Sequence, residues 1–346
     1  MRLIFPSLAA LKRAARGLLA PVVVATALTP TFAHAKDAAP INLGYANCAH
    51  CTPMALTPQY ATGVKLTVTS FNTGNDVLTA LLSKSLDVAQ VTYGHYVTAL
   101  DKGFKVVAIS GQINGGTQML LANSLPVQPG DWDGLKKLIA QYKKDGKPFR
   151  VAASRGSPQD IDMRGEFLMH GIDINKDVQF VNIPNPADHV QALRVGSVEL
   201  VTSTEPYATQ IREVKAAKFF AFPYDQAAGK LTNLIITRPD VIASNPQGVL
   251  ETVRAIVKVD DMMAANKPLF VDTIQKVTGL DKNIAAGAVD NLYPDYKMYR
   301  ASAVSIAKMM HDLKYANSDV SDAVQKNLDY SFLEKVTGKP KTELGY

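Results

Sequence analysis

Short apolar runs alternate with stretches of helical spacing along most of the chain. Residues 64–71 alternate apolar and polar side chains as a strand does, and Val77, Leu78, Leu81 and Leu82 follow at helical spacing. Other segments of strand character lie at 41–45, 88–91, 105–110, 149–153, 178–183, 199–201 and 231–237. Strands that alternate with helices predict an α/β fold with crossover helices and a parallel sheet.

The strand–helix pattern restarts after residue 136, so it predicts two similar α/β halves. After residue 237 the spacing predicts a section dominated by helices, at 246–266, 269–278, 284–292 and 301–313. Ligands of open α/β sheets bind beyond the carboxyl ends of the strands. We therefore expect two Rossmann-like lobes that face a ligand cleft, with the turns after the strands lining it.

The first 35 residues have the pattern of a secretory signal peptide. Four basic residues and no acidic one precede an apolar stretch at 17–33. The segment then closes with Ala33-His34-Ala35, which has small residues at the positions that signal peptidase recognises. A membrane anchor is the alternative, but the stretch is shorter than the ~20 residues needed and contains Pro21 and Pro30. We expect cleavage after Ala35, export to the periplasm and no membrane insertion after cleavage.

Charge gives no support to nucleic-acid binding. The 346 residues include 37 basic and 31 acidic side chains, a net charge of +6. Without the first 35 residues, 33 basic side chains face 31 acidic ones. A polyanion-binding surface needs a larger excess of positive charge.

Three stretches, 78–109, 150–171 and 190–209, resemble the periplasmic solute-binding proteins of ABC importers, of the nitrate/sulfonate/taurine type. Within the first, that family has a short motif of glycine, any residue, Leu or Val, and Asp before a strand. Ser85-Leu86-Asp87 stands at this place here, without the glycine. The resemblance implies a type II periplasmic binding protein fold, with two lobes joined by two crossover strands near 117–122 and 231–237. It places lobe 1 at 36–118 plus 232–346 and lobe 2 at 119–231. It also implies a monomer that captures a solute by lobe closure, delivers it to a permease and performs no chemistry.

The turn after the strand at 149–153 has the features of an anion site. Gly156 allows a tight turn, Ser157 is a natural N-cap, and Pro158 suits the first position of a helix. Such a helix start presents free backbone N–H groups and partial positive charge. Ser154, Ser157 and Arg155 would add donors, although plain capping with a solvated arginine explains the same residues.

Other turns after strands supply further candidate ligand contacts. For the residues at 73–75 the alternative is an ordinary turn, for His95 it is an ordinary surface histidine, and for Glu205 it is a helix cap. Gln112 lies beside the expected hinge. The candidates are Thr73, Gly74 and Asn75; Thr92, Tyr93, Gly94 and His95; Glu205 and Tyr207; and Gln112.

Cys48-Ala49-His50-Cys51 follows the first strand and is not predicted by the family resemblance. In an oxidising compartment the two cysteines of the chain are expected to form a disulfide, Cys48–Cys51. Such a short loop adds only about 2 kcal/mol by the chain-entropy model, so shaping a binding loop is its better explanation. We count Cys48, His50 and Thr52 among the ligand contacts. Free thiols, redox exchange or a copper or zinc site with Met54 are the alternatives.

The leading hypothesis is capture of a small organic anion, such as a sulfonate or an aromatic carboxylate, without cofactor or metal. If Glu205 rather than Arg155 faces the ligand, an amine or a pyrimidine is favoured. An enzyme related to pyrimidine-forming proteins and a periplasmic metal or redox protein are the remaining alternatives. Six scattered histidines define no catalytic triad.

Overall fold

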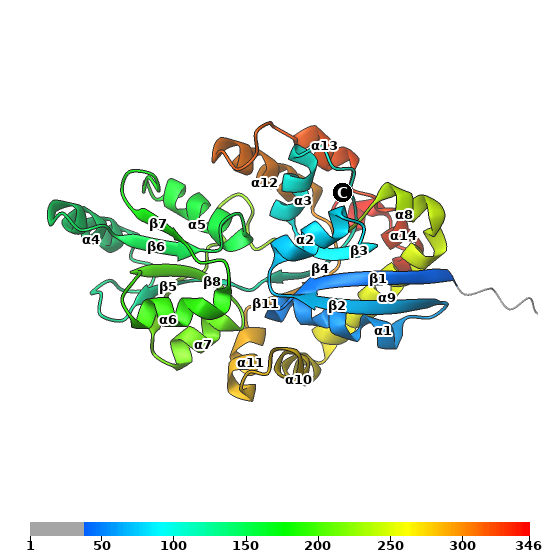
Figure 1. The fold of residues 1–346 in the computed structure, drawn as a ribbon, viewed down its shortest axis with the longest axis horizontal. Helices are drawn as coiled ribbons and strands as arrows, with labels where there is room; N and C mark the ends of the chain where they lie inside the picture. The colour runs from blue at the N-terminus through cyan, green and yellow to red at the C-terminus, as the bar shows by residue number, and fades with distance from the viewer. Residues whose placement is uncertain (1–37) are drawn as a thin grey trace, which may run out of the picture. The chain divides into compact units, whose positions relative to one another are not determined.

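Two β-sheets organise residues 38–346, which are the residues that this computed structural model describes (Figure 1). The predicted signal peptide at 1–35 and its cleavage site lie outside the described residues. Residues 36–346 form one compact unit. Among residues 38–346, no helix has both the length and the apolar character that a membrane span requires. The predicted α/β class is confirmed.

The first sheet has six strands in the order β11-β4-β10-β3-β1-β2. β1 pairs in parallel with β2 and β3, whereas β10 and β11 run antiparallel to their partners, so the expected parallel sheet is in fact mixed. β11 lies at the edge and contains Pro294, which an edge strand tolerates. The strands are β1 (Ala38–Ala46), β2 (Val64–Phe71), β3 (Val88–Thr92), β4 (Val107–Gly115), β10 (Asn233–Thr237) and β11 (Leu292–Asp295).

The second sheet has five strands in the order β7-β6-β8-β5-β9. β6 is parallel to β7 and β8, and β5 is antiparallel to β8 and β9. β9, like β11, was not predicted from the pattern. The strands are β5 (Thr117–Ala122), β6 (Arg150–Ala153), β7 (Gln179–Asn182), β8 (Leu200–Thr204) and β9 (Ala217–Ala221).

Helices follow the strands much as the spacing predicts. Those before residue 214 are η1 (Ala49–Leu56), α1 (Thr57–Tyr60), α2 (Gly74–Leu82), α3 (Tyr93–Asp101), α4 (Trp132–Lys144), α5 (Pro158–Met169), η2 (Pro186–Asp188), α6 (His189–Arg194) and α7 (Tyr207–Glu213). The helical C-terminal section comprises α8 (Pro239–Ser244), α9 (Pro246–Ala265), α10 (Lys267–Thr278), α11 (Lys282–Val289), α12 (Arg300–Asp312), α13 (Ser321–Lys326), α14 (Ser331–Thr337) and η3 (Lys341–Glu343).

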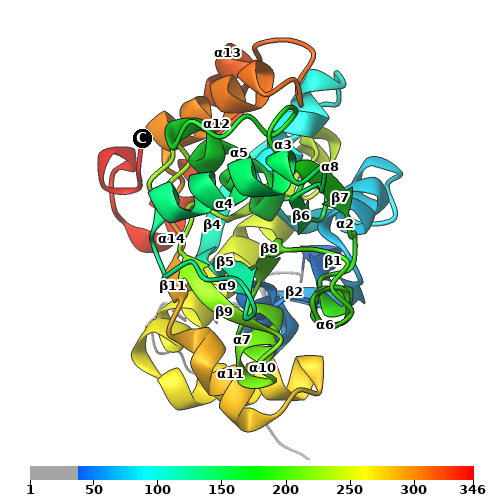
Figure 2. The same ribbon diagram turned by 90° about the vertical axis from the view of Figure 1, so that its left-hand side faces the viewer.

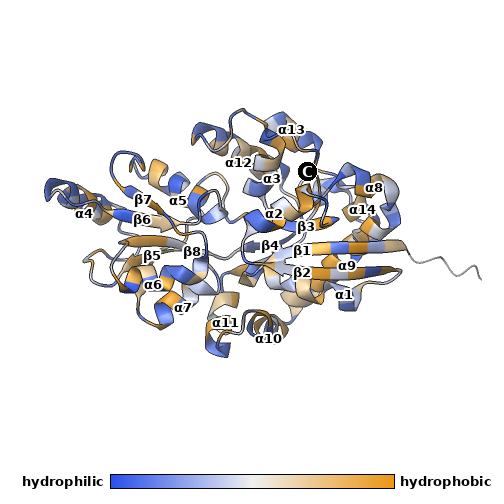
Figure 3. Cartoon of the chain, in the orientation of Figure 1, coloured by the Kyte–Doolittle hydropathy of each residue, from blue (hydrophilic) through white to orange (hydrophobic). Residues whose placement is uncertain are grey.

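Helices cover both faces of the second sheet (Figure 2). Met119 and Leu121 of β5 pack in the cluster that includes α4 and α5, and Leu120 packs in the cluster that includes α6 and α7. Side chains of a strand point alternately to its two faces, so β5 contributes to both clusters. Figure 3 shows β5 largely hydrophobic and α4 largely hydrophilic. The first sheet has its own larger cluster, which includes Leu43 and Ile235.

The chain passes between the sheets twice. Gly115 and Gly116 join β4 to β5, and residues 222–232 lead from β9 back to β10. Both glycines have positive φ, +80° and +83°. A Cβ on Gly116 would lie 2.8 Å from His50 Nδ1. The first passage therefore requires glycine, and the stretch expected as the first crossover strand, 117–122, belongs wholly to the second sheet as β5.

Candidate functional site

A cavity lies where the carboxyl ends of strands from both sheets meet. The empty space in and around it, with the open solvent at its mouth included, amounts to about 560 Å³. Its wall comes from the segments that follow β1, β2, β3 and β6, from the end of β8 and from the start of β10. The lining residues are Ala46, Asn47, Cys48, His50, Cys51, Asn72, Thr73, Gly74, Gln90, Val91, Thr92, His95, Ser154, Ser157, Pro158, Gln159, Pro184, Pro186, Thr204 and Asn233.

Three helices begin at this cavity, and the N-cap residue of each lines it. The hydroxyl of Thr73 accepts a bond from Asp76 N at the start of α2 (3.2 Å), and that of Thr92 accepts from the third residue of α3 (3.3 Å). Ser157 caps α5 from the second sheet, with Pro158 at the first helical position. Helix N-termini carry partial positive charge and unpaired N–H groups. The three helix starts therefore bring partial positive charge to the cavity, which the carboxylates of Asp76 and Asp160 in the first turns of α2 and α5 partly offset.

None of the described residues that line the cavity is Asp, Glu, Lys or Arg. Its titratable side chains are two buried histidines. Burial lowers the pKa of His50 and of His95 to about 4 each, because the buried environment disfavours the charged imidazolium. Both are neutral near pH 7 and add no charge to the lining.

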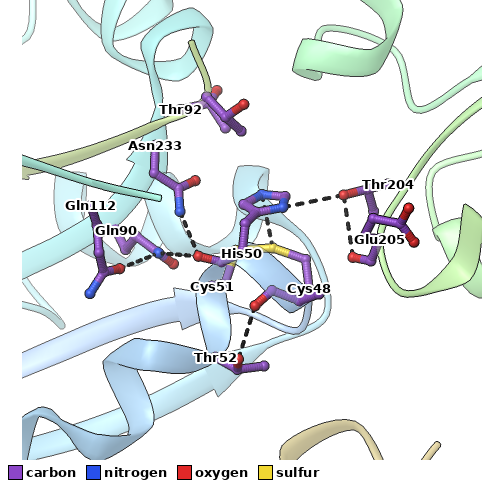
Figure 4. The surroundings of a disulfide bond; sticks show 12 residues. Cys48, His50, Cys51, Thr52, Gln90, Thr92, Gln112, Thr204, Glu205 and Asn233 are labelled. Atoms are coloured by element: carbon purple, nitrogen blue, oxygen red, sulfur yellow. Dashed lines mark hydrogen bonds between the residues drawn. A yellow bond between two sulfur atoms is a disulfide. The ribbon is translucent and has the colours of Figure 1, made fainter. Parts of the chain in front are cut away.

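His50 connects the walls of the cavity (Figure 4). Its Nδ1 lies 3.4 Å from the Thr204 hydroxyl on β8, and its Nε2 lies 3.1 Å from Cys48 Sγ. The His50 carbonyl accepts bonds from Gln90 Nε2 (3.2 Å) and from Asn233 Nδ2 (2.8 Å). One residue thus links the loop after β1 to both sheets.

These two bonds orient the amides of Gln90 and Asn233. Because the nitrogens face a carbonyl, the oxygens Gln90 Oε1 and Asn233 Oδ1 point elsewhere, and neither has a hydrogen-bond partner among the described residues. The buried Oδ1 of Asn47 also lacks a described partner. All three residues line the cavity. Buried acceptors without donors are costly, so a donor that reached these three oxygens beside the cavity would stabilise them.

Cys48 and Cys51 form a disulfide, with their Cα atoms 5.1 Å apart, and both residues line the cavity. Thr52 does not line it, because its hydroxyl donates to Ala49 O within the same loop (2.9 Å). Metal-ligating atoms of Cys48, His50 and Cys51 lie within 4.8 Å of one another.

The structure brings eight of the residues predicted from the sequence together at the cavity and leaves nine outside its lining. Those at the cavity are Cys48, His50, Thr73, Gly74, Thr92, His95, Ser154 and Ser157. Those outside are Thr52, Asn75, Tyr93, Gly94, Gln112, Arg155, Gly156, Glu205 and Tyr207.

Arg155, expected to contact the ligand, is exposed. Its guanidinium lies 4.8 Å above the Phe180 ring, and its backbone N–H donates to Asn182 Oδ1 (2.9 Å). Gly156 makes the tight turn with φ of +76°. The turn thus contributes Ser154 and Ser157 to the cavity, while the arginine stacks on a neighbouring strand.

Glu205 is completely buried, but it faces away from the cavity. Its carboxylate accepts bonds from Gln118 Nε2 and from Thr209 N (3.0 Å), so it caps the start of α7, where Tyr207 is half-buried. Burial raises the pKa of Glu205 to about 7. Glu205 therefore does not face a ligand in the cavity, and the preference for an amine ligand that depended on this contact does not hold.

The remaining residues outside the lining support the cavity from behind or lie apart from it. Gln112 is buried and accepts a bond from Gln90 Nε2 (2.6 Å), which helps to orient that amide. Tyr93 is buried in the core of the first sheet, and a Cβ on Gly94 would lie 3.0 Å from Ile161 Cδ1 on α5. Asn75 is exposed on the first turn of α2.

Sequence reasoning missed Asn47, Gln90, Thr204 and Asn233. Gln90 gave a usable signal, because it is a polar residue within the apolar strand β3. Asn47 directly follows β1 and gave a weaker one. Asn233 and Thr204 lie at strand ends, and only the pairing of the strands brings them to the cavity.

Comparison with known proteins agrees with this fold. The nitrate-binding protein NrtA from Synechocystis PCC 6803 matches with a TM-score of 0.74 and 15% identity over 88% of this chain and 90% of that one. A ligand-binding component of an ABC-type import system from Staphylococcus aureus, with zinc bound, gives 0.72 and 14% over 87% and 99%. The alkanesulfonate-binding protein SsuA from Xanthomonas axonopodis pv. citri, bound to MOPS, gives 0.69 and 14% over 84% and 98%.

These likenesses confirm the predicted periplasmic binding protein fold. No curated protein sequence gives a significant match. The model of the NMT1-like family matches residues 34–274, which is more than half of the chain. The protein therefore belongs to the NMT1-like family and has the fold of the nitrate- and sulfonate-binding periplasmic proteins.

Proposed function

We propose that the protein is the solute-binding component of an ABC importer, and that it captures a small organic anion between two lobes. The observation that carries the proposal is the convergence of three helix N-termini, those of α2, α3 and α5, on a cavity whose described lining residues include no charged side chain. Structural neighbours that bind nitrate or alkanesulfonate, or that serve an ABC-type import system, support this class of function.

The free energy that each contact contributes explains why several helices are needed. A helix terminus contributes ~0.3–1 kcal/mol and a charged hydrogen bond roughly 1.5–3 kcal/mol. Micromolar affinity requires about −8 kcal/mol, so contacts from both sheets must act together. α2 and α3 belong to the first lobe and α5 to the second, so a bound solute favours the closed arrangement.

The three buried amide oxygens narrow the class of solute. Asn47, Gln90 and Asn233 offer acceptors, which an inorganic oxyanion without hydrogen cannot satisfy. We infer an organic anion that also has N–H or O–H donors. A neutral donor-bearing heterocycle such as an aminopyrimidine is the second candidate, favoured by the same oxygens.

Location and partners follow from this role. We propose that residues 1–35 direct export and are removed after Ala35, that the protein acts as a monomer in the periplasm, and that it delivers its solute to permease subunits without transforming it. The lobes expected at 36–118 plus 232–346 and at 119–231 are adjusted to the passages between the sheets, so that β5 from Thr117 onward belongs to lobe 2.

A charge placed in the cavity tests the sign of the solute. Once a thermal-shift screen of sulfonates, carboxylates, nitrate and aminopyrimidines has identified a binder, its affinity is measured by calorimetry for Ser154→Asp and for the matched neutral variant Ser154→Asn. For an anion we expect a loss of more than a hundredfold with Asp and less than tenfold with Asn. Equal losses, or tighter binding with Asp, would contradict the anionic class.

A further inference from the structure

We propose that reduction of the Cys48–Cys51 disulfide turns the wall of the cavity into a Zn²⁺ site, with both thiolates and the His50 imidazole as ligands. The proposal does not depend on which solute the cavity binds. It rests on the geometry, the support and the charge of the loop that follows β1.

The three side chains already lie at chelating distance. Their ligating atoms fall within 4.8 Å of one another, and His50 Nε2 is 3.1 Å from Cys48 Sγ. Zinc–sulfur bonds of about 2.3 Å and zinc–nitrogen bonds of about 2.0 Å separate tetrahedral ligands by roughly 3.5 Å. Two cysteines separated by two residues also have a spacing that zinc sites use. Small side-chain rotations therefore suffice, and no element has to move.

The surroundings hold the imidazole in place. The Thr204 hydroxyl contacts His50 Nδ1 at 3.4 Å, which leaves Nε2 directed toward the sulfur of Cys48. Gln90 and Asn233 both bind the His50 carbonyl and fix the loop. Groups of this kind orient metal ligands and raise affinity by about 10- to 100-fold.

Charge balance selects the metal. Two thiolates neutralise a divalent ion, and no charged residue is among the described residues that line the cavity, so the zinc-bound site is neutral overall. A monovalent ion such as Cu⁺ would leave a net charge of −1 on the site, whereas zinc gives a neutral site and binds thiolates and imidazole together. All three ligands line the cavity, so the fourth coordination position of the zinc faces it.

The site exists only in the reduced protein, and its formation has a simple balance. A dithiol reductant supplies two electrons and two protons, the bond between the sulfurs of Cys48 and Cys51 breaks, and the dithiol becomes a disulfide. Zn²⁺ then displaces the two thiol protons. In the oxidised protein the sulfurs have no thiolate to offer, so it does not bind zinc here.

The test titrates the mature protein with Zn²⁺ alone. Protein reduced with dithiothreitol and freed of it by anaerobic gel filtration is compared with oxidised protein, in competition with a chromophoric chelator. We expect one equivalent of zinc in the reduced form and none in the oxidised form. Co²⁺ should give thiolate-to-metal charge-transfer bands in the reduced form only.

Variants separate this site from adventitious binding. Cys48→Ser should abolish binding, and His50→Gln should weaken it at least tenfold, whereas His311→Gln, which removes a surface histidine, should leave it unchanged. Alkylation of reduced wild-type protein with iodoacetamide gives the same test without a substitution that affects folding. Zinc binding that survives alkylation, or equal binding by oxidised protein, would overturn the proposal.

Discussion

Burial sets the protonation of the titratable residues near the cavity, and it acts in opposite directions on bases and acids. His50 and His95 are held neutral, with pKa values of about 4. Glu205 stays protonated in weakly acidic solution, with a pKa of about 7, because its buried position disfavours the carboxylate more than Gln118 and Thr209 stabilise it. An acid whose pKa rises on folding stabilises the fold below its unfolded pKa, near 4.5, and this stability is lost as pH rises through about 7.

Glu205→Gln should therefore change the pH dependence of stability rather than stability at every pH. At pH 5 the variant should unfold at nearly the same urea concentration as wild type, because Glu205 is protonated in the folded protein. At pH 8 it should be more stable, by about 2–3 kcal/mol, since no buried carboxylate forms. Gln118 Oε1, which has no partner among the described residues, can accept the new amide. A constant difference between the variants across this pH range would contradict the assignment.

At the scale of single elements, the turns determine the site more than the helices do. The strand–turn–helix units were predictable because each depends on local signals: a two-residue or helical period, a glycine, and a capping Ser or Thr. β9 and β11 gave no such signal. Leu292-Tyr293-Pro294-Asp295 has the composition of a turn, and it becomes a strand only because it pairs with residues 112–115 of β4.

The glycine passage between the sheets gives a test at this scale. Gly116→Ala should destabilise the protein by more than Gly130→Ala, although both glycines have a positive φ, +83° and +73°. A Cβ on Gly130 meets nothing within 4 Å, whereas one on Gly116 meets His50 at 2.8 Å. We expect about 1 kcal/mol for the control and at least twice that for Gly116→Ala in urea unfolding. Equal losses would mean that the contact with His50 is unimportant.

At the scale of the whole chain, hydrogen bonds between the two sheet-centred halves support a closed arrangement. The Tyr315 hydroxyl, beside the core of the first sheet, donates to Asp160 on α5, and Asp160 also accepts from Arg164 (2.8 Å). Ala49 N donates to the carbonyl of Glu205 (2.9 Å). Such contacts bias the closed state before any solute contributes.

Tyr315→Phe should weaken solute affinity about 3- to 10-fold without altering a residue of the cavity, because the closed state loses one charged hydrogen bond. Tyr299→Phe is the matched control, since its hydroxyl also donates to a carboxylate, Asp295 (2.5 Å), but within the first half. Small-angle scattering of the unliganded variants should show expansion for Tyr315→Phe only. Equal effects of the two substitutions on affinity would rule out a closure contact.

The sequence by itself determined the order of most strands and helices, the helix-capping residue Ser157 and the two-lobed plan, because these depend on period and capping within short segments. Only the tertiary structure decided that Arg155 stacks outside the cavity, that Glu205 caps α7, and that Asn47, Gln90 and Asn233 present free oxygens. Those outcomes depend on which distant strands pair and on which polar atoms that pairing buries. Local sequence has no information on either.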